Sequence, residues 1–313
     1  MSYTVTIKEE ISSIKSTKSE LIAEMSAYIR NNGHITKNKI TMTTENKFLV
    51  DRVTSSLEEL FNTTLSVDII ENLNFSKNKL YQITINNKVL DILKDLGIYD
   101  KDNKYLGTVP DYIVGGNSEI RAYLRGVFSS VGSINDPKTS RYHLELLVSE
   151  AKEAVFVQKL LNIFELNAKI LNRDKGYMIY IKEAEKISDF IKILGANKAV
   201  LYFENVRIYR DQKNKTNRLN NCEQANMDKI IQTATNQLED IKVIEDNDGV
   251  VLLDDKVKVV LEYRKKYPEA SLKELAEIIS SETNKSITKS GLNHRLRKIK
   301  DLANKFKKMS KED

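Results

Sequence analysis

The sequence of 313 residues contains one cysteine, no tryptophan, three prolines and three histidines. With Cys222 as its only thiol, the chain can form no internal disulfide and no zinc site that needs several cysteines. His34, His143 and His294 stand far apart, without the spacing that metal ligands require. We therefore expect no metal, no cofactor and no small-molecule ligand.

Long apolar runs are also missing. No stretch of about eighteen apolar residues is present to span a membrane, and residues 1–19 lack the apolar segment of a secretory signal. Apolar residues still make up 41% of the chain, which is ample for a buried core. These features predict a cytoplasmic protein, associated with the nucleoid if it binds DNA, that has no membrane partner.

Most of the chain has no excess of charge. Up to residue 251 it holds 34 basic and 34 acidic residues, whereas residues 252–313 hold 16 and 10, so the net charge of +6 belongs to the last fifth. From Lys285 to Lys308, nine basic residues stand against Asp301 alone. Basic charge concentrated in one small module is typical of nucleic-acid binding. A plain solvated basic tail is the alternative.

One pattern occurs twice. Residues 19–35 read SELIAEMSAYIRNNGHI, and residues 118–134 read SEIRAYLRGVFSSVGSI. Later segments align as well, so that the two copies cover about residues 19–97 and 118–195. A long period with only two copies indicates a duplicated domain. The aligned small residues Ala27 and Gly126 would let the two helices approach closely.

Each copy predicts the same order of elements. An amphipathic helix ends at a glycine and is followed by a short strand, a second helix, a hairpin-like pair of strands and a third helix. This order indicates an α+β fold with helices on one face of an antiparallel sheet.

The C-terminal segment predicts a helix-turn-helix. A helix over residues 253–267 closes before Pro268, and Ser271 and Glu274 form a capping box that opens the next helix. After a polar stretch, Thr288 can cap a third helix. We expect this third helix to enter the major groove. The residues predicted to contact DNA are Ser286, Thr288, Lys289, Ser290, Asn293, His294, Arg295, Arg297 and Lys298.

These residue types suit different parts of DNA. Asn and Arg side chains can make bidentate contacts with adenine and guanine, whereas Lys and Ser more often bind phosphate. His294 suits a base or a phosphate equally.

A second group of basic residues lies between the two modules. Residues 226–241 predict a linker helix after it, and we expect a division into residues 1–205, a basic linker over 206–248, and a DNA-binding domain over 249–313, with the helix-turn-helix at about 271–303. The residues of this predicted basic patch are Arg207, Arg210, Lys213, Lys215 and Arg218.

Three separated runs, residues 123–146, 204–229 and 287–299, resemble the WhiA regulators of bacteria. That family joins a LAGLIDADG homing-endonuclease-like region to a C-terminal helix-turn-helix. The resemblance implies a saddle-shaped α+β domain, a DNA-binding tail, and a role in transcription linked to cell division and chromosome segregation. The polar stretch before Ile287 is longer than the turn of the family.

Active LAGLIDADG nucleases carry an acidic residue before each paired glycine, and the two carboxylates hold divalent metals. Asn32 and Val131 occupy these positions here. Valine offers no ligand and asparagine only a neutral oxygen, while Glu24 and Asp136 lie nearby but are not paired by the duplication. We therefore expect a catalytically inactive scaffold rather than an enzyme.

Two functions follow as hypotheses. The first is a DNA-binding transcriptional regulator without nuclease activity, whose partners are double-stranded DNA and another regulatory protein or RNA polymerase. The alternative is a weakly sequence-specific nucleoid or protein-interaction scaffold. Whether the saddle contacts DNA or a protein stays open. Lys79, Tyr81, Lys175 and Tyr177 of its hairpins suit either partner, and also suit a plain solvated strand face.

Overall fold

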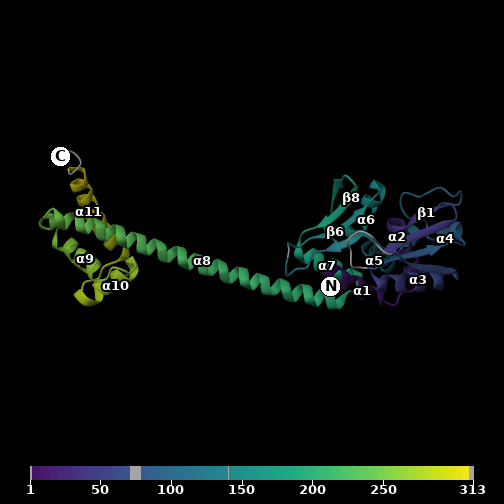
Figure 1. Ribbon diagram of the computed structural model, residues 1–313. Coiled ribbons are helices and arrows are strands. Elements are labelled where there is room, and N and C mark those ends of the chain that lie inside the picture. Colours follow the sequence, from purple (N-terminus) through teal and green to yellow (C-terminus); the bar gives the residue numbers. More distant parts are fainter. Residues whose placement is uncertain (1, 71–78, 140, 310–313) are drawn as a thin grey trace. The chain divides into compact units, whose positions relative to one another are not determined.

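The computed structural model describes residues 2–70, 79–139 and 141–309. The chain divides into two compact units, Met1–Arg210 and Asp211–Asp313, and Figure 1 labels their α-helices and some of their strands. No helix in the described part of the chain is long and apolar enough to cross a membrane.

The first unit contains the predicted duplication. Helix α1 (Tyr3–Ser12) precedes both copies, and the short helix η1 (Asp111–Val114) lies between them. The first copy consists of α2 (Lys18–Asn32), β1 (His34–Thr36), β2 (Lys39–Thr44), α3 (Lys47–Phe61), β3 (Leu65–Ile70), β4 (Leu80–Ile85) and α4 (Val89–Asp95). The second consists of α5 (Asn117–Val131), β5 (Gly132–Ile134), β6 (Leu144–Val148), α6 (Ala151–Ile163), β7 (Lys169–Arg173), β8 (Gly176–Ile181) and α7 (Ala184–Leu194).

The two copies build equivalent sheets. Each is antiparallel and has four strands, in the orders β1-β2-β4-β3 and β5-β6-β8-β7. Met42 pairs with Ile83 in the first sheet, and Leu146 pairs with Ile179 in the second. All four side chains are buried, because residues opposite each other on neighbouring strands share a face. The predicted α+β duplication is therefore confirmed.

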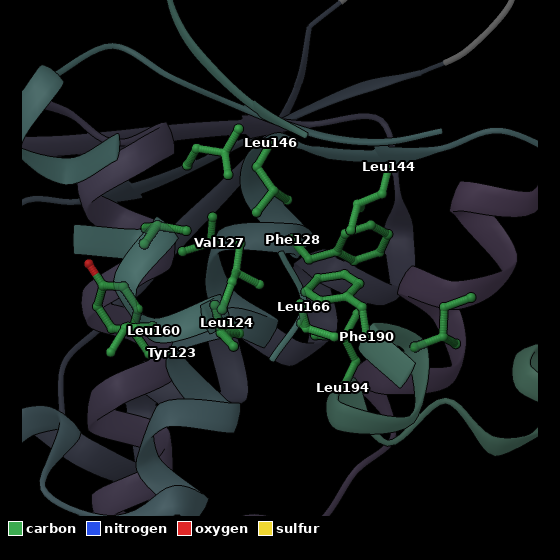
Figure 2. Close-up of a cluster of buried hydrophobic side chains, with 14 of the residues drawn as sticks. Tyr123, Leu124, Val127, Phe128, Leu144, Leu146, Leu160, Leu166, Phe190 and Leu194 are labelled. Atoms are coloured by element: carbon green, nitrogen blue, oxygen red, sulfur yellow. The ribbon is translucent and has the colours of Figure 1, made fainter. Parts of the chain in front are cut away.

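Apolar side chains of helices and strands fill each copy. In the second copy, Phe128 of α5 and Phe190 of α7 meet edge to face at 5.8 Å between ring centroids. Figure 2 shows these rings below Leu144 and Leu146 of β6, with Leu124 and Val127 beside them. A separate cluster, which includes Met25, Ile40 and Ile83, fills the first copy.

Helices α2 and α5 pack directly on each other. A methyl group added at Gly126 would lie 2.2 Å from the carbonyl oxygen of Glu24 and 2.8 Å from Cβ of Ala27. Contacts this short are not tolerated in packed interiors, so only glycine fits there. The predicted close approach of the duplicated helices is confirmed.

Helix α8 (Asn197–Asp246) starts in the first unit and ends in the second. Its start is fixed by α1, because the Glu10 carboxylate accepts the N–H groups of Lys198 and Ala199 at 2.8 and 3.0 Å. The Tyr3 hydroxyl donates to the Ala199 carbonyl at 2.8 Å. The helix is longer than the predicted 226–241 and includes the whole predicted basic patch, whereas the division at residues 205 and 248 stays a prediction.

The second unit is helical. After the short helix η2 (Gly249–Leu252) come α9 (Asp255–Lys266), α10 (Leu272–Thr283) and α11 (Lys289–Met309). The Ser271–Glu274 capping box is present in full, and the Thr288 hydroxyl accepts the Gly291 N–H at 3.1 Å at the start of α11. Both predicted caps are confirmed.

The polar stretch between these helices is mostly helix. Residues 280–283 form the last turn of α10, so only residues 284–288 connect it to α11. Ser280 and Thr283 donate to carbonyls one turn earlier in α10 at 2.7 and 2.6 Å. Asn284 then takes a left-handed conformation and ends the helix. The remaining connection is still longer than the usual turn of about three or four residues, and its difference from the turn of the family stays a prediction.

Candidate nucleic-acid interface

Asn32 and Val131 are the last residues of α2 and α5. The Asn32 amide donates to the Thr43 carbonyl at 2.9 Å and to the Tyr28 hydroxyl at 3.1 Å, and its oxygen faces the Thr43 N–H at 3.5 Å. Val131 is half-buried against the core of the second copy. Asn32 therefore ties the end of α2 to β2, and neither position presents a carboxylate.

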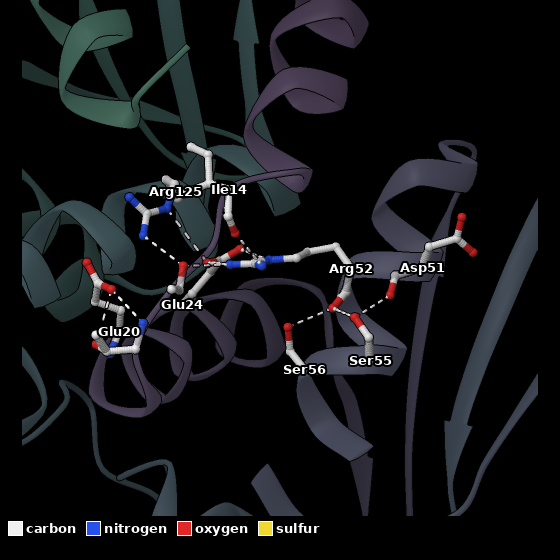
Figure 3. Close-up of polar contacts among 10 residues, drawn as sticks. Ile14, Glu20, Glu24, Asp51, Arg52, Ser55, Ser56 and Arg125 are labelled. Carbon is white, nitrogen blue, oxygen red and sulfur yellow. Dashed lines mark hydrogen bonds and ion pairs between the residues drawn. The ribbon is translucent and has the colours of Figure 1, made fainter. Parts of the chain in front are cut away.

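Glu24 is buried in a cluster of charges. Arg52 of α3 donates to its two oxygens at 3.1 and 2.7 Å, and the Arg125 Nε of α5 lies 3.7 Å away. Figure 3 shows Arg52 reaching across to Glu24, with Arg125 on the other side of the carboxylate. A carboxylate held by two guanidinium groups is a structural ion pair between the copies.

Asp136 is also engaged. It accepts the Tyr202 hydroxyl at 3.1 Å and the backbone N–H of Lys138 at 2.8 Å. Across residues 2–70, 79–139 and 141–309, no group of three or more His, Cys, Asp and Glu side chains is placed to hold a metal ion.

A second inward cluster joins α2 to α6. The Tyr123 hydroxyl donates to Oε1 of Glu153 at 2.6 Å, and Nε of Arg30 lies 3.9 Å from Oε2. Burial raises the pKa of the Glu153 carboxyl, and its hydrogen bond with Tyr123 opposes that shift. Arg30 also donates to the Gly97 carbonyl at 2.9 Å. These charges stabilise the duplicated unit and are not available to a ligand.

In the second unit, α11 has one buried side and one exposed side. Leu292, Leu296 and Ile299 are buried against α9 and α10. Ser290 and His294 lie on the opposite side and are exposed. An amphipathic helix anchored in this way leaves a polar face open along its length.

The predicted DNA contacts do not all lie on this open face. Asn293 is half-buried and lines a cavity of about 320 Å³ on the side of α8; Arg297 also borders this cavity but is exposed and belongs to the open face. Arg295 is half-buried on the other side of α11, where it lines a cavity of about 360 Å³ together with Ser286.

Thr288, Lys289 and Ser290 lie at the start of α11, and Lys298 lies in its middle. Thr288 is occupied as the helix cap, whereas Lys289 and Ser290 are exposed in the first turn. Lys298 forms an ion pair with Asp254 at 3.0 Å, and this hydrogen bond lowers the pKa of the Asp254 carboxyl. Exposed ion pairs contribute little to stability, so a phosphate could replace Asp254 as the partner of Lys298.

The members of the predicted basic patch on α8 differ in their contacts. The Arg207 guanidinium pairs with Glu204 at 2.7 Å, while that of Arg210 donates to the Pro137 carbonyl and lies 5.0 Å from the ring centroid of Tyr142. The other three members are exposed on the same helix, and these are Lys213, Lys215 and Arg218.

The hairpin residues of the two sheets differ in exposure. Lys79 and Lys175 are exposed, whereas Tyr81 and Tyr177 are half-buried and pack against the cores of the two copies. The tyrosines are therefore not the free surface residues that the sequence suggested, because their rings cover the edge of the core.

The last part of α8 is a component of this interface that the sequence analysis missed. Ala234, Ile241 and Ile244 are buried in the second unit, and Thr233 and Asn236 line the cavity that Asn293 and Arg297 also line. The apolar spacing of 234, 241 and 244 is helical and was the available signal.

Comparisons with known proteins agree along the chain. Three family models match: the WhiA N-terminal LAGLIDADG-like domain at residues 18–99, the WhiA LAGLIDADG-like domain at 120–213, and the WhiA C-terminal HTH domain at 216–303. A "Probable cell division protein WhiA" of Staphylococcus aureus is 40% identical over 311 residues, or 98% of each chain. Its namesake from Enterococcus faecalis is 38% identical, covering 99% of this chain and 100% of that one.

A solved structure shares the fold. The crystal structure of full-length DUF199/WhiA from Thermatoga maritima has 22% identity and a TM-score of 0.59, and it covers 98% of this chain and 99% of that chain. Three family models match in consecutive order, and the relatives match over nearly their full length. These matches all name one family. The protein belongs to the WhiA family.

Proposed function

We propose that the protein is a DNA-binding transcriptional regulator that recognises sequence through α11. The observation that carries this proposal is the exposed face of α11, which lies opposite a buried apolar side; the helix as a whole carries eight basic residues against Asp301 alone. A helix of this kind, braced by a preceding helix, fits the major groove of B-DNA.

The proposed roles follow from position. His294 and Arg297 lie in the second and third turns of α11 on its exposed side and suit base contacts, since Arg can bind guanine in a bidentate manner. Lys289 and Ser290, at the exposed start of the helix, suit backbone phosphates. Asn293 reaches DNA only at the edge of the face, because it is half-buried toward α8.

The proposal includes no nuclease reaction. Metal-dependent cleavage needs carboxylates that converge on divalent cations. At the helix ends where a homing endonuclease would carry them stand Asn32, bonded to β2, and Val131. Metal-dependent nicking of plasmid DNA that persists when Glu24 and Asp136 are both mutated would contradict this part.

We place the regulated process in cell division and chromosome segregation, on the basis of the names of the relatives, and the protein in the cytoplasm at the nucleoid. Another regulatory protein or RNA polymerase would then be a partner. One observation favours the alternative, a nucleoid or protein-interaction scaffold: Leu147 and Leu171 are 42% and 43% exposed on neighbouring parts of the second sheet. Exposed apolar side chains gathered on one face are typical of protein contacts.

Competition binding separates these two functions. Full-length protein is titrated into a labelled promoter duplex, taken from regions bound in the native organism, at several salt concentrations and with unlabelled random DNA as competitor. A regulator should prefer the promoter by about 10³-fold or more. A ratio near one would favour the scaffold, and no binding to either DNA would contradict both.

A further inference from the structure

A cavity of about 230 Å³ lies where α8, α9, α10 and α11 meet in the second unit, and it shares Lys289 with the proposed DNA-contacting face. Ile230, Ala234 and Leu272 form its apolar part. Its charged lining comes from four cations and no acid, and these are Lys229, Arg264, Lys273 and Lys289. Such a volume is several times the roughly 30 Å³ that one water occupies in the liquid.

Arg264 of α9 is the unusual member of this lining. It is 1% exposed, and among the described residues no carboxylate lies within ion-pair distance of it. Its Nη1 donates to the Ala270 carbonyl at 2.7 Å and, more weakly, to that of Tyr267 at 3.4 Å, while its buried Nε has no partner within the ranges that the structure covers. Buried charges are normally paired, so Arg264 is a candidate to bind an anion.

The start of α10 adds neutral donors. The capping box uses the N–H of Ser271, bonded to Glu274 at 2.8 Å, and that of Glu274, bonded to the Ser271 hydroxyl at 3.3 Å. Within the described chain the N–H groups of Leu272 and Lys273 have no protein acceptor. Free N–H groups at a helix start, together with the helix dipole, bind phosphate and other anions.

The nearby acids are already engaged. Glu274 is held by the capping box, and its hydrogen bonds there lower the pKa of its carboxyl. Glu277 lies 4.0 Å from the Lys273 ammonium, in a pair whose side chains are 79% and 66% exposed. Such an exposed pair contributes little, so Lys273 can turn toward the cavity.

We propose that this cavity binds a phosphate group, with Arg264 as its buried anchor and Lys229, Lys273 and the start of α10 as its other ligands. The same phosphate chemistry has two sources, the backbone of bound DNA and free inorganic phosphate. The geometry favours the DNA backbone as the source of the phosphate, because Lys289 lines the cavity and is also the first residue of the proposed recognition helix. This choice rests on the proposed function; the phosphate site itself does not.

The DNA arm uses the full chain and a fluorescein-labelled random-sequence duplex, because a backbone contact does not depend on sequence. The variant is Lys229→Gln with Lys273→Gln; both side chains are exposed, so folding should be kept. Its matched control is Lys258→Gln with Lys265→Gln on α9, which removes the same charge outside the cavity. The cavity variant should bind roughly tenfold more weakly and lose about one unit of slope in the plot of log affinity against log salt. The control should lose much less of both.

The phosphate arm measures thermal unfolding of the same proteins in sodium phosphate and in sodium chloride of equal ionic strength. Phosphate stabilises many proteins through general exclusion, so the comparison is between variants. If free phosphate occupies the cavity, the wild type and the control should gain about 2 °C or more beyond the cavity variant.

The outcomes separate the sources and the hypotheses. A DNA effect without a phosphate effect assigns the cavity to the DNA backbone, and a phosphate effect assigns it to the free anion. If the wild type binds no DNA, the proposed function fails, while the phosphate arm still decides the site. If the cavity variant matches its control in both arms, the site does not exist.

Discussion

Helices α2 and α5 of the first unit and helix α11 of the second use charged residues in opposite ways. Between α2 and α5, Glu24 is closed in by Arg52 and Arg125 and is shielded from solvent (Figure 3). On α11, Ser290, His294 and Arg297 face outward from an apolar side that packs in the core. Charges in the first region hold two copies of a fold together, whereas most of the charged side chains of α11 lie at the surface.

The two regions differ in how far their charges act. A buried charge that is fully paired stabilises only its own surroundings, because both partners have exchanged water for each other. An exposed cation keeps its long-range field and attracts phosphate in a salt-dependent manner. Under the proposed function, the exposed cations of α11 are therefore the ones that attract DNA.

The largest expected effect comes from Glu24→Gln. This change leaves Arg52 and Arg125 buried without their carboxylate, and removing one partner of a buried pair costs about 3–5 kcal/mol. Denaturant unfolding, followed by probes placed in each unit, should show the transition of the first unit shifted by that amount. DNA affinity measured without denaturant should be unchanged.

The control for this change is Asp51→Asn on α3, an exposed acid close in sequence to Arg52. It removes the same charge and should cost less than about 0.5 kcal/mol. Equal effects of the two variants would mean that the Glu24 cluster is not the charge that joins the copies.

The next largest effect on the free energy of unfolding comes from the close contact between α2 and α5. Gly126→Ala should destabilise the first unit by about 1–3 kcal/mol, since the added methyl overlaps the backbone of α2. Gly115→Ala is the matched control, because its new methyl would meet nothing closer than 3.8 Å. The free energy of unfolding of the two variants decides the point, and a tolerated Gly126→Ala would show that the helices can move apart.

For the second region the sharpest test is Arg297→Ala against Lys308→Ala. Loss of a bidentate base contact should reduce the preference for promoter over random DNA by about 1–3 kcal/mol. Loss of Lys308, exposed near the end of α11, should weaken binding to all sequences alike. Competition titrations measure both quantities, and equal loss of affinity on every sequence in both variants would remove Arg297 from base recognition.

Local patterns made the fold and the caps predictable. The duplicated helices, the Ser271–Glu274 box and the cap at Thr288 depend on residues close in sequence, and all appear in the structure. The polar stretch before Ile287 has no apolar period that would mark where the helix ends. In the structure residues 280–283 complete α10, with Ser280 and Thr283 bonded to carbonyls one turn earlier, and residues 284–288 form the connection.

The partners of charged side chains could not be predicted in the same way. Glu24 finds Arg125 across the duplication, and Arg30 finds Glu153 across two different helices. The side of α11 that Asn293 occupies depends on where α8 packs. These contacts join residues far apart in the chain, so the spacing of residues within one segment cannot predict them.

The smallest expected effect concerns an inward charge that has no carboxylate. Lys8 of α1 is half-buried with its ammonium 5.7 Å from the ring centroid of Phe128, and burial lowers its pKa to about 8. Between that value and the ordinary pKa of about 10.4 the unfolded chain binds more protons than the folded one. Wild-type stability should therefore rise as the pH increases from about 8 to 10.

Lys8→Met should remove this rise, on the order of 1 kcal/mol, when the free energy of unfolding is measured at several pH values and compared with the wild type. Lys37→Met, at an exposed lysine of the first copy, should leave the rise in place and serves as the control. If Lys8→Met retains the full dependence, the cation is solvated in the folded protein. The buried charges of α2 and α5 would then remain the contrast to α11, without a contribution from Lys8.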